Sequence, residues 1–70
     1  MTKSAYVKNL GGWIRRERRA LELRQAELAR AIGVSESSVS RWESGASSPD
    51  AYTHALVRAY FRQRREMKGQ

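Results

Sequence analysis

A row of polar side chains between residues 36 and 44 is the part of the sequence best suited to binding chemistry. If this segment is a helix, Val39 and Trp42 share its inner face, and the outer positions fall at i, i+1, i+4, i+5 and i+8. Those outer residues are Glu36, Ser37, Ser40, Arg41 and Ser44. Serine hydroxyls donate and accept hydrogen bonds, a guanidinium donates two in parallel, and a carboxylate accepts. The face therefore suits recognition of a polar surface.

The sequence contains few of the residue types that carry out catalysis or bind metals. The 70 residues include no Cys and one His, His54, so thiolate zinc sites, disulfides and a Ser-His-Asp triad are not expected. We expect no cofactor and no metal, and we interpret the protein as a non-enzyme. Fourteen Lys and Arg against seven Asp and Glu give a net charge of +7, which favours an anionic partner such as nucleic acid.

The elements that position the polar row are expected to be helices. Only two Thr occur, and no run of β-branched residues alternates with polar ones. The patterns predict helices over about 4–22, 25–32, 36–44 and 49–68, the last as one long helix or two abutting ones. We therefore expect a single all-α domain over residues 1–70, a compact bundle of four to five helices.

Glycine, serine and proline mark the joints between these helices. Gly33 is expected to end the second helix in a left-handed conformation, and Gly45 to end the third. Ser35 is expected to cap the third helix, and Ser48 the last, with Pro49 at its first helical position.

Two adjacent glycines, Gly11 and Gly12, lie inside the first helical segment. Each costs about 1 kcal/mol relative to alanine in a helix interior. Either the helix begins near Leu10, or the glycines let a neighbouring element approach closely.

The stretch from Gln25 to Ser44 combines two short helices with a turn that contains glycine, which is the helix-turn-helix pattern. Ala29 is small where the two helices would cross, and Gly33 can supply a positive φ in the turn. A shared apolar core is expected from Leu28, Ile32, Val34, Val39 and Trp42.

From Leu10 to about Leu56 the chain resembles the Cro/cI-type helix-turn-helix family, also called the xenobiotic-response-element family. The matching features are Leu10-Gly11, Ile14, Arg18, the run 25–29, Gly33-Val34-Ser35, Glu43-Ser44-Gly45 and Pro49. Three positions depart from the family pattern. Glu22 stands where a small residue or Gly is usual, Arg24 replaces a Ser, Thr or Asn cap, and Trp42 replaces a smaller aliphatic residue.

The resemblance implies a lambda-repressor-like fold and a sequence-specific regulator of transcription that binds double-stranded DNA. We expect a repressor that binds an inverted-repeat operator as a homodimer, with the 36–44 helix in the major groove. Base reading is expected of Glu36, Ser37, Ser40 and Arg41. Arg41 suits guanine O6 and N7, and Glu36 suits the cytosine amino group.

Contacts to the DNA backbone are expected from a second set of residues. These are Arg24, Gln25, Arg30, Ser44, Gly45 and Ser47. The resemblance implies the phosphate contact of Gln25, and the loop after residue 44 is expected to offer backbone N–H groups and hydroxyls. The resemblance also implies that Arg18 and Glu43 form a partly buried ion pair between the first helix and the recognition helix.

An apolar stripe on the last helix is the predicted dimer interface. It consists of Leu56, Tyr60, Phe61 and Met67, and an alternative interface lies around Tyr6 and Trp13.

Other functions stay open at this point. The basic stripe from Arg58 to Lys68 would suit an antitoxin-type module that binds a partner protein and also autoregulates its operon. A basic helix that binds RNA or a membrane surface is a third reading. No segment resembles a signal peptide or a membrane span, so we expect a cytoplasmic protein, in the host cell if phage-encoded, without a membrane partner.

Overall fold

The computed structural model describes residues 3–68, with side chains from residue 10 onward, and its described part is all-α, as predicted. The helices are α1 (Lys3–Ala20), α2 (Gln25–Ile32), α3 (Glu36–Ser44) and α4 (Ala51–Lys68). The C-terminal segment is therefore one long helix, α4. The side chain of Tyr6, part of the alternative dimer interface, lies outside the described residues.

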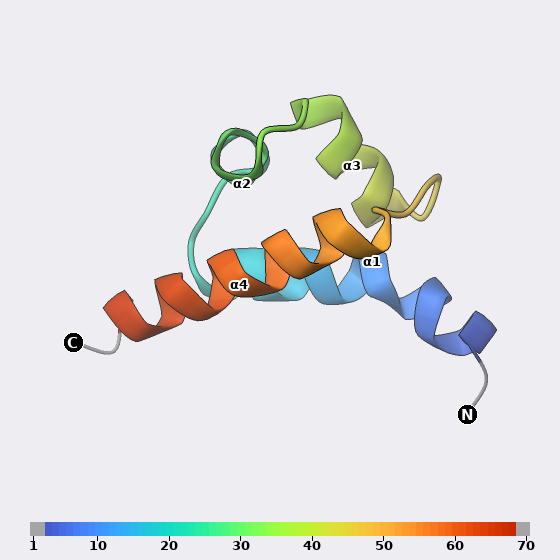
Figure 1. Ribbon diagram of the computed structural model, residues 1–70, viewed down its shortest axis with the longest axis horizontal. Coiled ribbons are helices and arrows are strands. Elements are labelled where there is room, and N and C mark those ends of the chain that lie inside the picture. The colour runs from blue at the N-terminus through green and yellow to red at the C-terminus, as the bar shows by residue number, and fades with distance from the viewer. Residues whose placement is uncertain (1–2, 69–70) are drawn as a thin grey trace.

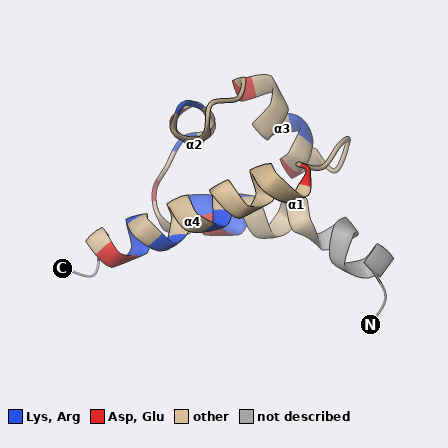
Figure 2. Cartoon of the chain, viewed as in Figure 1, with Lys and Arg blue, Asp and Glu red and all other residues tan. Residues whose placement is uncertain are grey.

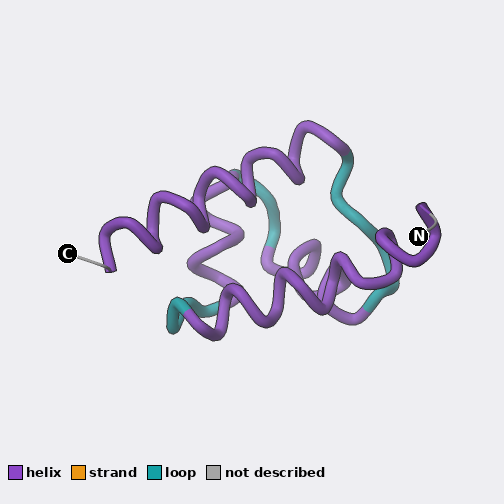
Figure 3. Tube along the Cα trace, turned by 90° about the horizontal axis from the view of Figure 1, so that it is seen from below, coloured by secondary structure: helices purple, strands orange, loops and turns teal. Residues whose placement is uncertain are grey.

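The helices form two layers, with α2 and α3 on one side of the pair α1 and α4 (Figure 1). Figures 1 and 3 both show α1 and α4 running in the same direction. Three of the contacts that join them share a separation of 48 residues along the chain: Trp13 with Phe61, Glu17 with Arg65, and the Ala20 carbonyl with the Lys68 side chain. A constant separation means that the two helices lie parallel and in register.

A single apolar core connects the two layers. Its buried members are Leu10, Ile14, Leu21, Leu23, Leu28, Ala29, Val39, Trp42, Val57 and Phe61. Ile32 and Val34, which the sequence also assigned to the core, are partly buried and pack against it. Burial of one such Leu, Ile or Phe side chain contributes about 1.5–3 kcal/mol, so the helix-turn-helix depends on α1 and α4 for its stability.

The inner face of α4 differs from the predicted stripe. Val57 and Phe61 are fully buried, whereas Tyr52 and Met67 are 73% and 58% exposed. The ring of Phe61 packs edge-on against Trp13 with centroids 5.6 Å apart. Phe61 has no surface to offer a second copy of the chain, so its assignment to the dimer interface is wrong. It belongs to the core because α4 turns that side chain toward α1.

The first turn of α4 begins two residues later than predicted. Ser48 does not cap the helix. Instead, Oδ1 of Asp50 accepts a hydrogen bond from the Thr53 N–H at 2.7 Å, and the helix starts at Ala51. The hydrogen bond from the Thr53 N–H is the main reason why the pKa of Asp50 is lowered. A carboxylate caps as well as a serine hydroxyl, so the carboxylate beyond Pro49 sets the start.

The turn between α2 and α3 has the predicted geometry. Gly33 has a φ of 80°, and its N–H donates to the Ala29 carbonyl at 2.9 Å. The Ser35 hydroxyl accepts a hydrogen bond from the Ser38 N–H at 3.1 Å, and Gly45 ends α3 with a φ of 86°. Both glycines therefore occupy positions where a side chain would be strained.

The junction between α1 and α2 uses two residues that depart from the family pattern. Glu22 has a φ of 59°, the left-handed region that favours glycine. Arg24 has no side-chain acceptor, and the Glu27 carboxylate accepts from the Arg24 N–H at 2.7 Å instead. A residue inside α2 thus supplies half of a capping box.

The two glycines in α1 have different surroundings. The helix continues through both, which excludes a start near Leu10. A Cβ on Gly11 would overlap the Trp42 carbonyl oxygen and would lie 3.3 Å from Cα of Glu43, whereas a Cβ on Gly12 would meet nothing within 4 Å. Gly11 therefore lets α1 touch the backbone of α3.

Candidate nucleic-acid interface

The outer face of α3 is open to solvent along its length. Its predicted polar residues, Glu36, Ser37, Ser40, Arg41 and Ser44, are all exposed. Val39 and Trp42 lie in the core on the opposite face, so the predicted register of the helix is correct. The side chains that point outward are short except for two, which leaves the helix slim enough for a groove about 12 Å wide.

Positive charge accompanies this face. Arg24, Arg30 and Arg41 are exposed, and none of the ion pairs within residues 10–68 uses them. Figure 2 shows basic segments on α2 and on α3. Glu36 lies in the first turn of α3, where a negative charge also complements the helix dipole. Three unpaired guanidiniums around α2 and α3 suit an anionic backbone.

The orientation of α3 is fixed by a buried ion pair. Nε of Arg18 donates to Oε2 of Glu43 at 2.7 Å, and its Nη2 donates to Oε1 at 3.0 Å. The third nitrogen, Nη1, donates to the Leu23 carbonyl at 2.7 Å. The Glu43 side chain is 1% exposed. One guanidinium thus joins α1, the segment before α2 and the recognition helix through a rigid planar fork.

Gln25 and Arg15 complete this network. Nε2 of Gln25 donates to Oε1 of Glu43 at 3.1 Å, and Nε of Arg15 lies 3.6 Å from the same oxygen. Neither contact could be predicted from the sequence, because the residues are far apart along the chain and only the fold brings them together. One amide hydrogen of Gln25 is left to donate to an external acceptor such as a phosphate oxygen.

The carboxylate at the centre stays charged. Burial is the largest influence on Glu43, and alone it would raise the pKa. The hydrogen bonds from Arg18 and Gln25 and the charges of Arg18 and Arg15 act in the opposite direction and outweigh it. The pKa of Glu43 is therefore lowered from its ordinary value of 4.5.

The loop after α3 differs in one respect from its predicted chemistry. Its backbone N–H groups turn back onto the helix. Those of Ala46 and Ser47 donate to the Arg41 carbonyl at 2.9 and 3.3 Å, and that of Gly45 donates to Trp42 at 3.2 Å. The Ser44 hydroxyl also donates to the Arg41 carbonyl, at 3.1 Å. Of the two hydroxyls predicted to contact the DNA backbone, that of Ser44 is thus already donated to the helix, and the exposed loop presents that of Ser47.

Within the described residues, no three His, Cys, Asp or Glu side chains gather closely enough to hold a metal ion. None of the helices that the structure describes is long and apolar enough to cross a membrane.

Comparison with known proteins agrees with this geometry. Residues 14–53, which are 40 of the 70 residues, match the helix-turn-helix family. Neither the curated proteins nor the solved structures gave a match. The matched segment begins in the middle of α1 and ends in the first turn of α4, so it contains the whole Arg18–Glu43 network and the exposed face of α3. The chain belongs to the Cro/C1-type helix-turn-helix family of DNA-binding transcriptional regulators.

Proposed function

We propose that the protein is a repressor that binds an inverted-repeat operator as a homodimer, with α3 in the major groove. The observation that carries the proposal is the exposed face of α3, held in place by the bidentate pair between Arg18 and Glu43. A protein bound in this way over a promoter blocks transcription by occupancy alone.

The base-reading role belongs to Glu36, Ser37, Ser40 and Arg41 in this proposal. Phosphate contacts come from Arg24, Arg30, Ser47 and the remaining amide hydrogen of Gln25. Ser44 joins them when its hydroxyl turns from the Arg41 carbonyl to a phosphate. Gly45 is exposed and has no side chain, so it lets the DNA backbone come close. Position supports this division. The first group lies on the outer face of α3, whereas the second lies at the end of α3, in the loop after it, and on or just before α2.

Replacing Arg41 with alanine should change which DNA sequence the protein prefers. Loss of a bidentate contact to guanine should cost about 1–3 kcal/mol at one base pair and relax the preference there. Equilibrium binding to a selected site and to its single-base-pair variants measures this. Arg62→Ala, on α4, removes the same charge and should keep the ranking of sites. Transcription from a promoter that overlaps the site should fall with the wild-type protein and recover with Arg41→Ala. An unchanged ranking in Arg41→Ala would exclude Arg41 as a base reader.

The dimer should place its two recognition helices about one helical turn of DNA apart, near 34 Å. With Phe61 in the core, the proposed interface is reduced to Leu56, Tyr60 and Met67 on α4. Met67→Glu should weaken cooperative binding to the two half-sites, whereas Ala55→Glu, an equal charge change on another face of α4, should not. Footprinting measures the spacing of the two half-sites, and the stoichiometry of the complex shows how many molecules bind each site. One molecule bound per selected site would contradict the dimer.

A further inference from the structure

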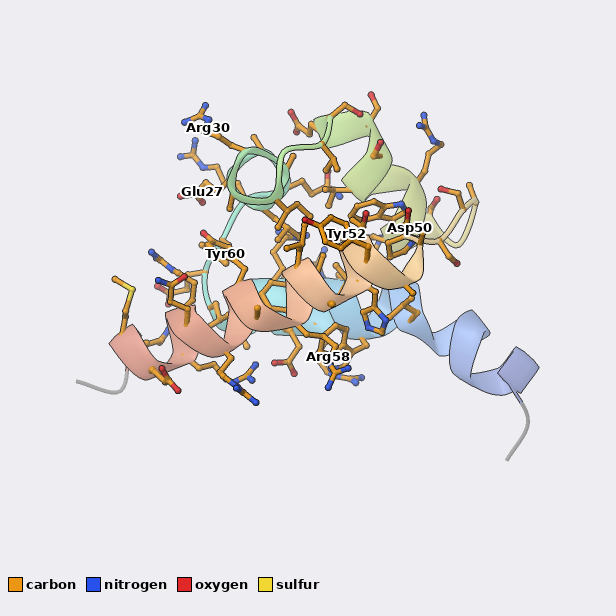
Figure 4. All side chains as sticks on the ribbon, in the orientation of Figure 1. Glu27, Arg30, Asp50, Tyr52, Arg58 and Tyr60 are labelled. Atoms are coloured by element: carbon orange, nitrogen blue, oxygen red, sulfur yellow. The ribbon has the colours of Figure 1, made fainter. Side chains whose placement is uncertain are left out.

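A groove of about 420 Å³ follows α4 where this helix packs beside α1. Its lining residues are Trp13, Ala55, Arg58, Ala59, Arg62 and Arg65, and we call it the α1–α4 groove. Figure 4 shows Arg58 on the side of α4 away from α2 and α3, whereas Tyr52 and Tyr60 lie on the side that faces them. The α1–α4 groove is thus separate from the face proposed to bind DNA.

One wall of the groove is a row of positive charge. Arg58, Arg62 and Arg65 occur at i, i+4 and i+7, which places them on one face of the helix. Arg65 also contacts Glu17 at 2.9 Å and is still half exposed. Within residues 10–68, Arg58 and Arg62 take part in none of the ion pairs and are exposed. Two of the three guanidiniums are therefore available to an external anion.

The floor of the groove is apolar. Trp13 is partly buried and stands edge-on to Phe61 and to His54, with ring centroids 5.6 and 6.0 Å away. Ala55 and Ala59 are exposed and small, so they leave room beside the indole. Burial, and after it the charge of Arg58, lowers the pKa of His54, in keeping with a local positive potential. The groove thus offers an apolar surface bordered by cations.

We propose that the α1–α4 groove binds an acidic helical segment of a partner protein. Carboxylates at i and i+4 of that segment pair with Arg58 and Arg62, and a carboxylate at i+7 lies beside the half-exposed Arg65, which keeps its pair with Glu17. The three arginines span about 10 Å along α4. One apolar side chain between the carboxylates covers Trp13, Ala55 and Ala59. The apolar floor favours a protein over a second DNA duplex, because a phosphate backbone has no group to place there. This proposal goes beyond DNA binding, since both surfaces can be occupied at once.

The test uses the full chain and a fluorescent helical peptide with Glu at i, i+4 and i+7 around one Leu. Fluorescence anisotropy should detect binding, and a peptide with Gln in place of Glu should bind more weakly. The double variant Arg58→Gln, Arg62→Gln should lose about tenfold in affinity for the Glu peptide, through two lost ion pairs. The control Arg16→Gln, Arg19→Gln has the same net charge, lies outside the groove, and should stay within about twofold of the wild type.

A second variant tests the floor without removing an arginine. Ala59→Glu puts a carboxylate inside the groove, where it both fills space and pairs with the neighbouring arginines, so peptide affinity should fall. All substituted positions are exposed, and circular dichroism should match the wild type. The proposal is overturned if the wild type does not bind the Glu peptide, if both double variants weaken binding equally, or if duplex DNA bearing the selected site displaces the peptide. Simultaneous binding of duplex and peptide supports it.

Discussion

Gly11→Ala should destabilise the protein by about 3 kcal/mol or more, or prevent it from folding. The new methyl group would meet the Trp42 carbonyl oxygen, a backbone atom that no rotamer change can move away. α1 and α3 would have to separate, which opens the core around Ile14 and strains the Arg18–Glu43 pair. Alanine gains about 1 kcal/mol of helix propensity over glycine, so the measured loss is the clash minus that gain.

Gly12→Ala is the matched control for this substitution. It makes the same chemical change one residue along the same helix, but Gly12 is exposed and its Cβ would have open space. This variant should be more stable than the wild type by up to about 1 kcal/mol. Urea unfolding of both variants measures the contrast. If both are stabilised alike, α1 and α3 do not pack through Gly11.

Arg18→Met should cost about 3 kcal/mol of stability, because it leaves the buried carboxylate of Glu43 without its bidentate partner. Gln25 and Arg15 remain near that carboxylate and limit the loss. Arg65→Met is the matched control, since it removes an arginine from the exposed pair with Glu17 and should cost under about 1 kcal/mol. Equal losses in the two variants would contradict a special role for the buried pair.

The same pair should make stability depend on pH. Since the pKa of Glu43 is lower in the folded state than its ordinary value of 4.5, ionised Glu43 stabilises the fold at neutral pH. This contribution is fully present above the unfolded pKa and is lost as pH falls through the folded pKa. Urea unfolding between neutral and acid pH should show a smaller loss for Glu43→Gln than for the wild type. If Glu43→Gln instead loses more unfolding free energy than the wild type as the pH falls, ionised Glu43 does not stabilise the fold.

Features that depend on neighbours in sequence could be predicted. The left-handed turn at Gly33, the cap at Ser35 and the inward face of Val39 and Trp42 follow from residue type and helical spacing, and the structure confirms them. These are local requirements. A left-handed φ favours glycine, and a helix start needs an acceptor, whatever the rest of the chain does.

Features that depend on how helices meet could not be predicted in the same way. The sequence of α4 contains two overlapping apolar patterns, and only the packing of α4 against α1 shows that Val57 and Phe61 face inward. Ser48 and Asp50 are both good caps two residues apart, so residue type alone could not choose between them. Similarly, nothing in the sequence near Gly11 shows that the Trp42 carbonyl is its neighbour.

The parallel pairing of α1 and α4 governs the order in which the protein can assemble. Three of the contacts that join these helices span 48 residues, so Trp13 has no Phe61 to pack against until residue 61 has been synthesised. Closing a loop of that length costs about 3 kcal/mol of chain entropy. The helix-turn-helix segments can collapse earlier because their contacts are shorter along the chain. Of the four described helices, α4 leaves the ribosome after the other three, and it is the one that seals the core. A nascent chain stalled before residue 61 leaves apolar side chains of α1 open to chaperones and proteases.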